Sequence, residues 1–215
     1  EGLPDIYVYD IVEDHYGNIW AGTDGGAAIC RLADRKVTIQ VLDYDQGLPD
    51  NIVKKLHVDK TNTVWMGTED AGVLSFNPAT GKTTTLIKEW KYGNLTDFAL
   101  EGDLVWISSP QSGLVLYDLK TSEAKLYNGN TGFDFMSVNT LLTDVEGNIW
   151  IGTKSGVIRT LGDHVEYIDQ FDPYANTSVL ALTVDKDENL WYSTNEGLFK
   201  RRVDESGKVF GEQLL

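Results

Sequence analysis

A short motif built around tryptophan recurs along the chain and constrains its fold more than any other feature. The five copies are Asn18-Ile19-Trp20-Ala21-Gly22-Thr23, Thr63-Val64-Trp65-Met66-Gly67-Thr68, Leu104-Val105-Trp106-Ile107-Ser108-Ser109, Asn148-Ile149-Trp150-Ile151-Gly152-Thr153 and Asn189-Leu190-Trp191-Tyr192-Ser193-Thr194. The tryptophans are 45, 41, 44 and 41 residues apart in a chain of 215. A period of about 40–50 residues is the length of one four-stranded blade of a β-propeller. The repeat therefore predicts an all-β chain of about five blades.

The pattern inside each repeat favours strands over helices. Short runs of β-branched and aromatic residues are cut by Gly, Asp and Asn, and no helical periodicity is sustained. In the first repeat we expect strands at 7–13, 18–23, 27–32 and 37–43. The whole chain, 1–215, is expected to be propeller, with repeats at approximately 1–45, 46–88, 89–130, 131–172 and 173–215.

The motif also predicts how neighbouring blades pack. Successive side chains of a strand point to opposite faces, so Trp20 and its neighbours Ile19 and Ala21 make both faces of the strand apolar. A sheet that is apolar on both faces must be covered on both. We expect the tryptophans to be packing anchors between blades, and the Gly or Ser two residues after each Trp to leave room for the next blade.

In repeats one, two and four the turn before the motif carries an Asp and then a residue suited to positive φ, as in Asp59 with Asn62. The fifth repeat places Glu188 in the second slot, which predicts a different loop conformation there. The third repeat is one residue shorter, with Gly102-Asp103 at the turn, and predicts a tighter hairpin.

Composition excludes several classes of protein. A formal net charge of −15 makes nucleic acid an unlikely partner, because the average field repels phosphate backbones. No segment has the length of an apolar membrane span, so direct membrane insertion is not expected, and the first residues, Glu1-Gly2-Leu3-Pro4, do not resemble a signal peptide. Cys30 is the only cysteine, which rules out an internal disulfide, and we interpret it as a small buried hydrophobic residue.

The repeats resemble a known family. The residues that carry the resemblance are Gly2-Leu3-Pro4-Asp5, Gly47-Leu48-Pro49-Asp50-Asn51, Gly147-Asn148-Ile149-Trp150-Ile151-Gly152-Thr153 and Gly156-Val157. They are similar to the two-component regulator propeller repeat, found in the extracytoplasmic sensors of hybrid histidine kinases and related proteins that often regulate polysaccharide use. The resemblance implies a sensor domain in the periplasmic or extracellular part of a membrane protein. Because family propellers usually have seven blades, this chain is either a closed five-bladed ring or a fragment of a larger one.

The sequence gives few signs of catalysis. His15, His57 and His164 lie in three different repeats without metal-ligand spacing, so we expect no metal site and no cofactor. Asp10 and Asp97 occupy the same slot of the first strand in repeats one and three, where a propeller could bring carboxylates to its axis. They act either as an acid–base pair or as acceptors for backbone and neighbouring polar groups, and the second interpretation is favoured.

Binding is better supported by the loops. In a propeller, the turns between second and third strands and the loops leading into the next blade share one end of the molecule, at the mouth of the central channel. Carboxylates, amides, a lysine and aromatic rings are predicted at this end, namely Asp24, Asp50, Asn51, Glu69, Asp70, Lys154, Asn195, Trp90, Tyr92, Phe135 and Tyr174. Trp90 is the only Trp outside the motif and is expected to be a ligand platform more than a structural cap.

Such rings beside carboxylates and amides suit a carbohydrate, and also a protein partner or a second copy of the chain. The leading hypothesis is a non-catalytic sensor or interaction propeller for a small-molecule or oligosaccharide ligand. The alternative is a propeller glycoside hydrolase or lyase that uses axial carboxylates.

Overall fold

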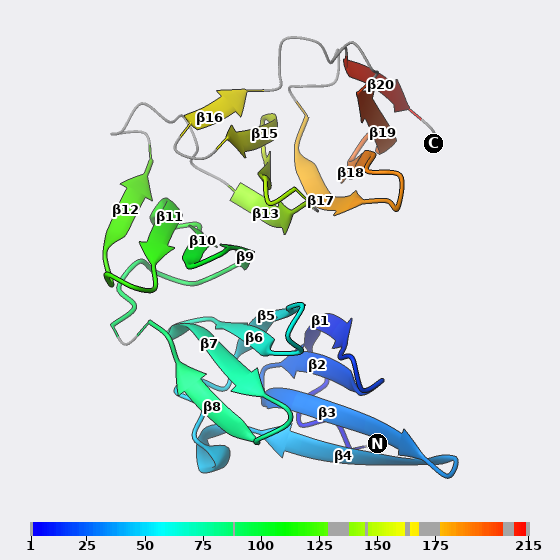
Figure 1. Cartoon of the computed structure of the whole chain (residues 1–215), viewed down its shortest axis with the longest axis vertical. Helices are drawn as coiled ribbons and strands as arrows, with labels where there is room; N and C mark the ends of the chain where they lie inside the picture. Colours follow the sequence, from blue (N-terminus) through cyan, green and yellow to red (C-terminus); the bar gives the residue numbers. More distant parts are fainter. Residues whose placement is uncertain are drawn as a thin grey trace. The chain divides into compact units, whose positions relative to one another are not determined.

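A computed structural model describes residues 2–87, 89–128, 138–144, 146–161, 164–167, 177–203 and 209–213. These residues form five four-stranded antiparallel sheets, each with its strands in chain order (Figure 1). We number these sheets blades 1 to 5. The predicted all-β propeller fold with four-stranded blades is confirmed.

The blades are made of consecutive strands. Blade 1 contains β1 (Val8–Glu13), β2 (Ile19–Thr23), β3 (Gly26–Ala33) and β4 (Lys36–Leu42). Blade 2 contains β5 (Val53–Val58), β6 (Val64–Thr68), β7 (Gly72–Asn77) and β8 (Lys82–Thr85). Blade 3 contains β9 (Asp97–Glu101), β10 (Leu104–Ser109), β11 (Gly113–Asp118) and β12 (Ala124–Tyr127). Blade 4 contains β13 (Val138–Thr143), β14 (Ile149–Thr153), β15 (Gly156–Leu161) and β16 (His164–Tyr167). Blade 5 contains β17 (Val179–Val184), β18 (Leu190–Thr194), β19 (Gly197–Val203) and β20 (Val209–Gln213).

The blades belong to two compact units. Unit 1 (Glu1–Thr96) holds blades 1 and 2, and unit 2 (Asp97–Leu215) holds blades 3, 4 and 5. A short 3-10 helix, η1 (Tyr44–Gln46), precedes blade 2. No helix in the described part of the chain is long and apolar enough to cross a membrane. The strands expected in the first repeat agree with β1 to β4 to within one residue at each boundary.

The motif tryptophan packs between the blades of unit 1, as predicted. Trp20 is fully buried, and its ring centroid lies 5.2 Å from that of Phe76 in blade 2. Val53 and Leu56 of blade 2 complete the same apolar cluster. The first strands of the two blades, β1 and β5, lie against each other. Burial of the Trp20 side chain against blade 2 therefore stabilises the packing of the two blades.

The glycines that follow the motif tryptophans do leave room for the neighbouring blade. A methyl group placed on Gly22 would lie only 2.6 Å from the backbone oxygen of Val53 in blade 2. In blade 4, a methyl group on Gly152 would lie 2.8 Å from the Val179 side chain of blade 5. At Gly22 and Gly152 the next blade therefore lies so close that it leaves no space for a side chain.

One face of blade 1 is more exposed than its equivalents. Ile19 is 40% exposed, whereas Val64 and Ile149, at the same position of blades 2 and 4, are fully buried. Cys30 is the cross-strand partner of Ile19 and is half-buried. The expectation that Cys30 is buried was therefore wrong, because the strand face that carries it is exposed in this blade.

Each motif tryptophan has a carboxylate partner that the sequence interpretation missed. In blade 1 the Trp20 indole N–H donates to Asp14 Oδ2 at 3.0 Å. The equivalent bonds run from Trp65 to Asp59, from Trp150 to Asp144, from Trp191 to Asp185, and in blade 3 from Trp106 to Glu101. Burial alone would raise the pKa of Asp14, but the hydrogen bonds from Trp20 and Asn18 outweigh it and lower that pKa. The Asp therefore fixes both its own turn and the indole orientation.

The turn of the fifth repeat corrects one expectation. Glu188 has φ +64°, the same value as Asn62 in the second repeat. Its backbone N–H donates to the Asp185 carbonyl at 3.0 Å, as that of Asn62 does to Asp59. The prediction of a different loop conformation was wrong, because the hydrogen bonds made by the Asp impose the turn whatever residue follows. The tighter hairpin predicted in the third repeat is present, because Glu101 pairs with Leu104 across only Gly102 and Asp103.

We expect Glu188→Gly to increase the free energy of unfolding by about 0.5–1 kcal/mol, because glycine adopts positive φ without the steric cost that a side chain incurs. Urea unfolding measures the change. Lys186→Gly is the matched control, since Lys186 lies in the same turn without a positive φ. A Glu188→Gly protein no more stable than Lys186→Gly would contradict the assignment of strain to this position.

Candidate functional site

Four side chains at one end of unit 1 form a connected set that we call the Tyr9 cluster. Its members are Tyr9, Asp24, Lys54 and Glu69. The Tyr9 hydroxyl donates to Asp24 Oδ1 at 2.7 Å. Lys54 Nζ lies 3.7 Å from the centroid of the Tyr9 ring and 3.3 Å from Glu69 Oε1. Tyr9 and Asp24 belong to blade 1 and the other two to blade 2, so the cluster spans the junction between these blades.

The Tyr9 cluster is charged and reaches solvent. Burial alone would lower the pKa of Lys54, but its interactions with Tyr9 and Glu69 outweigh burial and raise it. Lys54 therefore remains a cation at neutral pH. Tyr9 is 43% exposed, and Asp24 and Glu69 are half-buried. The cluster thus presents a cation, two carboxylates and an aromatic ring whose positions are fixed by mutual contacts.

An aromatic pair lies beside the same turn of blade 2. The rings of Trp90 and Tyr92 are in edge contact, with centroids 5.1 Å apart. The Trp90 side chain packs over Gly72, and its indole N–H donates to the carbonyl of Gly93. Trp90 is half-buried, so the ring caps the blade end as well as reaching solvent. The backbone bond from Leu95 N–H to the Glu69 carbonyl, 2.9 Å, holds this loop along the turn of the Tyr9 cluster.

Other predicted site residues in unit 1 have structural roles. Asp50 is buried and accepts backbone N–H bonds from Ile52 and Asp70. The Asn51 side chain accepts from the Tyr44 N–H at 2.8 Å, fixing η1 against the start of blade 2. Asp70 is exposed, but its backbone is held by Asp50. Asp50 and Asn51 therefore shape the loops of the site, and Asp70 is the exposed carboxylate among them.

The remaining predicted residues belong to unit 2 or lie outside the described part of the chain. Lys154 and Asn195 are exposed in the corresponding turns of blades 4 and 5 in unit 2. Phe135 and Tyr174 lie outside the described residues.

The two candidate axial carboxylates have backbone partners. Asp10 Oδ2 accepts from Leu56 N–H of the next blade at 2.9 Å, and its Oδ1 from Ile11 N–H. Asp97 Oδ2 accepts from Leu141 N–H of the next blade at 2.8 Å. Both side chains tie the first strands of adjacent blades together. Asp10 and Asp97 therefore act as acceptors for backbone groups, which is the role that the sequence analysis favoured for them.

Comparison with known proteins shows which repeat family parts of the chain resemble. The model of the two-component regulator propeller repeat matches residues 2–25 and 132–155, which include the motifs of the first and fourth repeats. The first and fourth repeats of the chain are therefore similar to two-component regulator propeller repeats.

Two proteins similar to this chain are named as signalling proteins. The chain is 27% identical over 163 residues to histidine kinase P4 of Formosa agariphila, covering 71% of this chain and 12% of the kinase. It matches the extracellular domain of a protein from B. thetaiotaomicron described as a hybrid two-component system, with a TM-score of 0.73, 19% identity, and coverage of 96% of this chain and 31% of that domain. The chain thus spans about an eighth of that kinase and under a third of that domain.

The propeller fold also occurs in an enzyme. Virginiamycin B lyase from Staphylococcus aureus matches with a TM-score of 0.66 and 16% identity, covering 96% of this chain and 70% of the lyase. At this identity the likeness concerns the fold alone.

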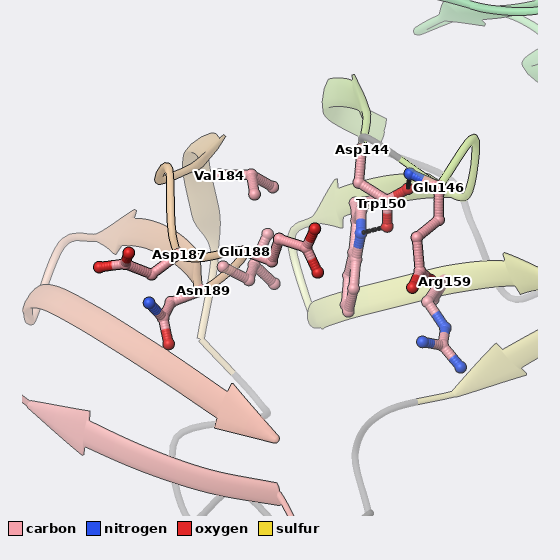
Figure 2. Close-up of a pocket in the computed structure, with 9 residues that line it drawn as sticks. Asp144, Glu146, Trp150, Arg159, Val184, Asp187, Glu188 and Asn189 are labelled. Atoms are coloured by element: carbon pink, nitrogen blue, oxygen red, sulfur yellow. Dashed lines mark hydrogen bonds between the residues drawn. The ribbon is translucent and has the colours of Figure 1, made fainter. Parts of the chain in front are cut away.

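Blades 4 and 5 form a pocket of about 370 Å³ that the sequence interpretation missed (Figure 2). Its lining combines carboxylates and an amide with a guanidinium, an indole and two aliphatic side chains, and consists of Asp144, Glu146, Trp150, Arg159, Val184, Asp187, Glu188, Asn189 and Leu190. One residue in the sequence could have indicated this pocket. Arg159 is the cross-strand partner of the motif tryptophan in blade 4, and the equivalent residue of blade 1 is Ile29.

Proposed function

We propose that this chain is a ligand-sensing part of an extracytoplasmic signalling protein, and that it recognises a glycan-derived ligand at the Tyr9 cluster and the adjoining Trp90 loop. The observation that carries the proposal is the Tyr9 cluster itself. It places a lysine, two carboxylates and a phenol ring across the junction of two blades, beside a second pair of aromatic rings.

The chemistry of this end suits a sugar. Sugar hydroxyl groups need both donors and acceptors, which Lys54, Asp24 and Glu69 supply in fixed positions. The apolar face of a sugar ring packs on an aromatic side chain, which Tyr9, Trp90 or Tyr92 offers. Because the cluster connects blades 1 and 2, a ligand there would contact both blades at once.

The relatives support the signalling part of the proposal. A histidine kinase is similar to the chain in sequence, and an extracellular domain described as part of a hybrid two-component system shares its fold. We infer a periplasmic or extracellular location, with the catalytic output carried by other segments of a longer protein. A protein partner or a second copy of the chain would use the same exposed aromatic residues.

The enzyme alternative has less support from the site. Glycoside hydrolysis requires two carboxyl groups that face the scissile bond. Asp10 and Asp97 are instead engaged by backbone N–H groups of the adjacent blades. Asp10 also lies 3.5 Å from the ammonium of Lys55.

The test of the proposed site is Trp90→Ala. We expect binding of an oligosaccharide to weaken by about 2 kcal/mol, roughly 30-fold, as for an aromatic side chain at the centre of a binding site. Because the ring packs over Gly72, we also expect a loss of about 1–2 kcal/mol in the free energy of unfolding. Calorimetric titration with a panel of oligosaccharides measures the first effect, and urea unfolding the second.

Trp90→Phe is the matched control, because it keeps a ring over Gly72 but removes the indole N–H. We expect its affinity to remain close to that of the wild-type protein. Unchanged affinity in Trp90→Ala, with reduced stability, would show that Trp90 is only a cap and would remove it from the site.

A further inference from the structure

The junction between blades 4 and 5 departs from the apolar junction between blades 1 and 2. In blade 1 the cross-strand partner of the motif tryptophan is Ile29, which is fully buried. In blade 4 that partner is Arg159, whose guanidinium carbon lies 5.6 Å from the centroid of the Trp150 ring. A second arginine, Arg201 of blade 5, is buried at the position that Phe76 fills in blade 2. Replacing apolar contacts by charges between blades costs stability, so a compensating function is expected.

The polar junction contains a pocket of suitable size. Its volume of about 370 Å³ is within the range of small-molecule sites. One wall is the buried indole of Trp150, fixed by its bond to Asp144, and the opposite wall is the turn Asp187-Glu188-Asn189 of blade 5. The Glu188 side chain extends from this turn toward Trp150 (Figure 2).

The carboxylates of the pocket divide into engaged and available groups. Both oxygens of Asp144 accept hydrogen bonds from its own turn and from Trp150. Glu146 accepts one bond, from the Asn148 amide. The side chains of Asp187 and Glu188 are exposed, and among the described residues no ion pair engages either of them. Glu188 is also the residue held at positive φ, a conformation that is retained at a cost.

The charge of the lining selects the class of ligand. Four carboxylates face one guanidinium, so an anion is repelled and a cation is attracted. Within the described part of the chain, no three His, Cys, Asp or Glu side chains are grouped closely enough to hold a metal ion. The aromatic and aliphatic walls instead suit the carbon skeleton of an organic molecule.

We propose that this pocket binds a small organic cation that carries a primary ammonium group. Glu188 and Asp187 are its counter-ions, and Trp150 with Leu190 contacts its carbon skeleton. The site involves other residues than the Tyr9 cluster and does not depend on glycan recognition there.

Calorimetric titration of the whole chain with spermidine and with glucosamine tests the proposal. We expect at least one of these amines to bind saturably, with N-acetylglucosamine, which lacks the charged amine, binding at least 10-fold more weakly than glucosamine if the site takes an amino sugar. Glu188→Gln keeps the size of the side chain and removes its charge, and we expect it to weaken amine binding about 10-fold. Glu123→Gln is the matched control, since it removes one negative charge from an exposed turn of blade 3 outside the pocket.

Three results would overturn the proposal. The first is the absence of binding by either amine at millimolar concentration. The second is equal weakening in Glu188→Gln and Glu123→Gln, which would show attraction to the net negative charge alone. The third is equal affinity for glucosamine and N-acetylglucosamine, which would show that the ammonium group is not recognised. None of these outcomes bears on binding at the Tyr9 cluster, which Trp90→Ala reports separately.

Discussion

Trp20→Ala is expected to lower the free energy of unfolding by about 3–5 kcal/mol, the cost of truncating a buried large aromatic side chain. Trp20 is fully buried and packs against Phe76 of the next blade. Its removal leaves a cavity at the junction of blades 1 and 2 and takes one donor from the buried Asp14. Urea unfolding followed by circular dichroism measures the loss.

Trp191→Ala serves as the comparison, because Trp191 has the same position in blade 5 but is only half-buried. Its truncation is expected to cost less than that of Trp20. A loss below about 1 kcal/mol in Trp20→Ala would mean that the motif tryptophan does not anchor the blades, and the packing described for unit 1 would be wrong.

Gly22→Ala is expected to cost about 2–3 kcal/mol, a large effect for one added methyl group. That methyl group would lie 2.6 Å from the Val53 backbone oxygen, so β1 to β4 and the next blade would have to separate. Backbone atoms of two packed sheets cannot yield in the way that a flexible side chain can.

The corresponding position of blade 5 is Ser193, where a side chain is already present. Ser193→Ala is therefore the control and should change stability by less than about 1 kcal/mol. If Gly22→Ala proved as mild as Ser193→Ala, the close approach of blades 1 and 2 at Gly22 would be refuted.

The sequence was sufficient to predict the blades, because a strict repeat fixes strand positions five times over. The tryptophan–carboxylate bonds were missed, although an Asp precedes Trp20, Trp65, Trp150 and Trp191 by the same six residues. The Asp lies in the turn and the Trp in the strand that follows, so no single periodicity relates them and only the turn geometry reveals the contact. The prediction of a different turn at Glu188 was wrong because it relied on the preference of Gly and Asn for positive φ. Backbone hydrogen bonds impose positive φ on Glu188 as well.

The candidate site combines residues that the sequence pointed to with residues that it did not. The loop residues Asp24, Trp90 and Tyr92 were named from the sequence, and they belong to the Tyr9 cluster and the adjoining aromatic pair. Tyr9 and Lys54 were missed because they belong to strands, where a polar side chain is easily interpreted as a solvent-facing one. No periodicity indicates that two such residues from adjacent blades will meet.

The pocket of unit 2 could be found only by comparing repeats with one another. The cross-strand partner of the motif tryptophan is uncharged in blades 1 to 3 and a cation in blades 4 and 5, where it is Arg159 and Lys200. Departures from a repeat of this kind indicate positions where packing has been exchanged for another role.

The most direct test of the proposed function combines equilibrium binding with product analysis on the same sample. The protein is titrated with oligosaccharides, and each ligand is then recovered and analysed by chromatography. The account predicts saturable binding that Trp90→Ala weakens, with every oligosaccharide recovered intact. Conversion of an oligosaccharide to products, abolished by Asp10→Asn, would contradict it and would identify the chain as an enzyme.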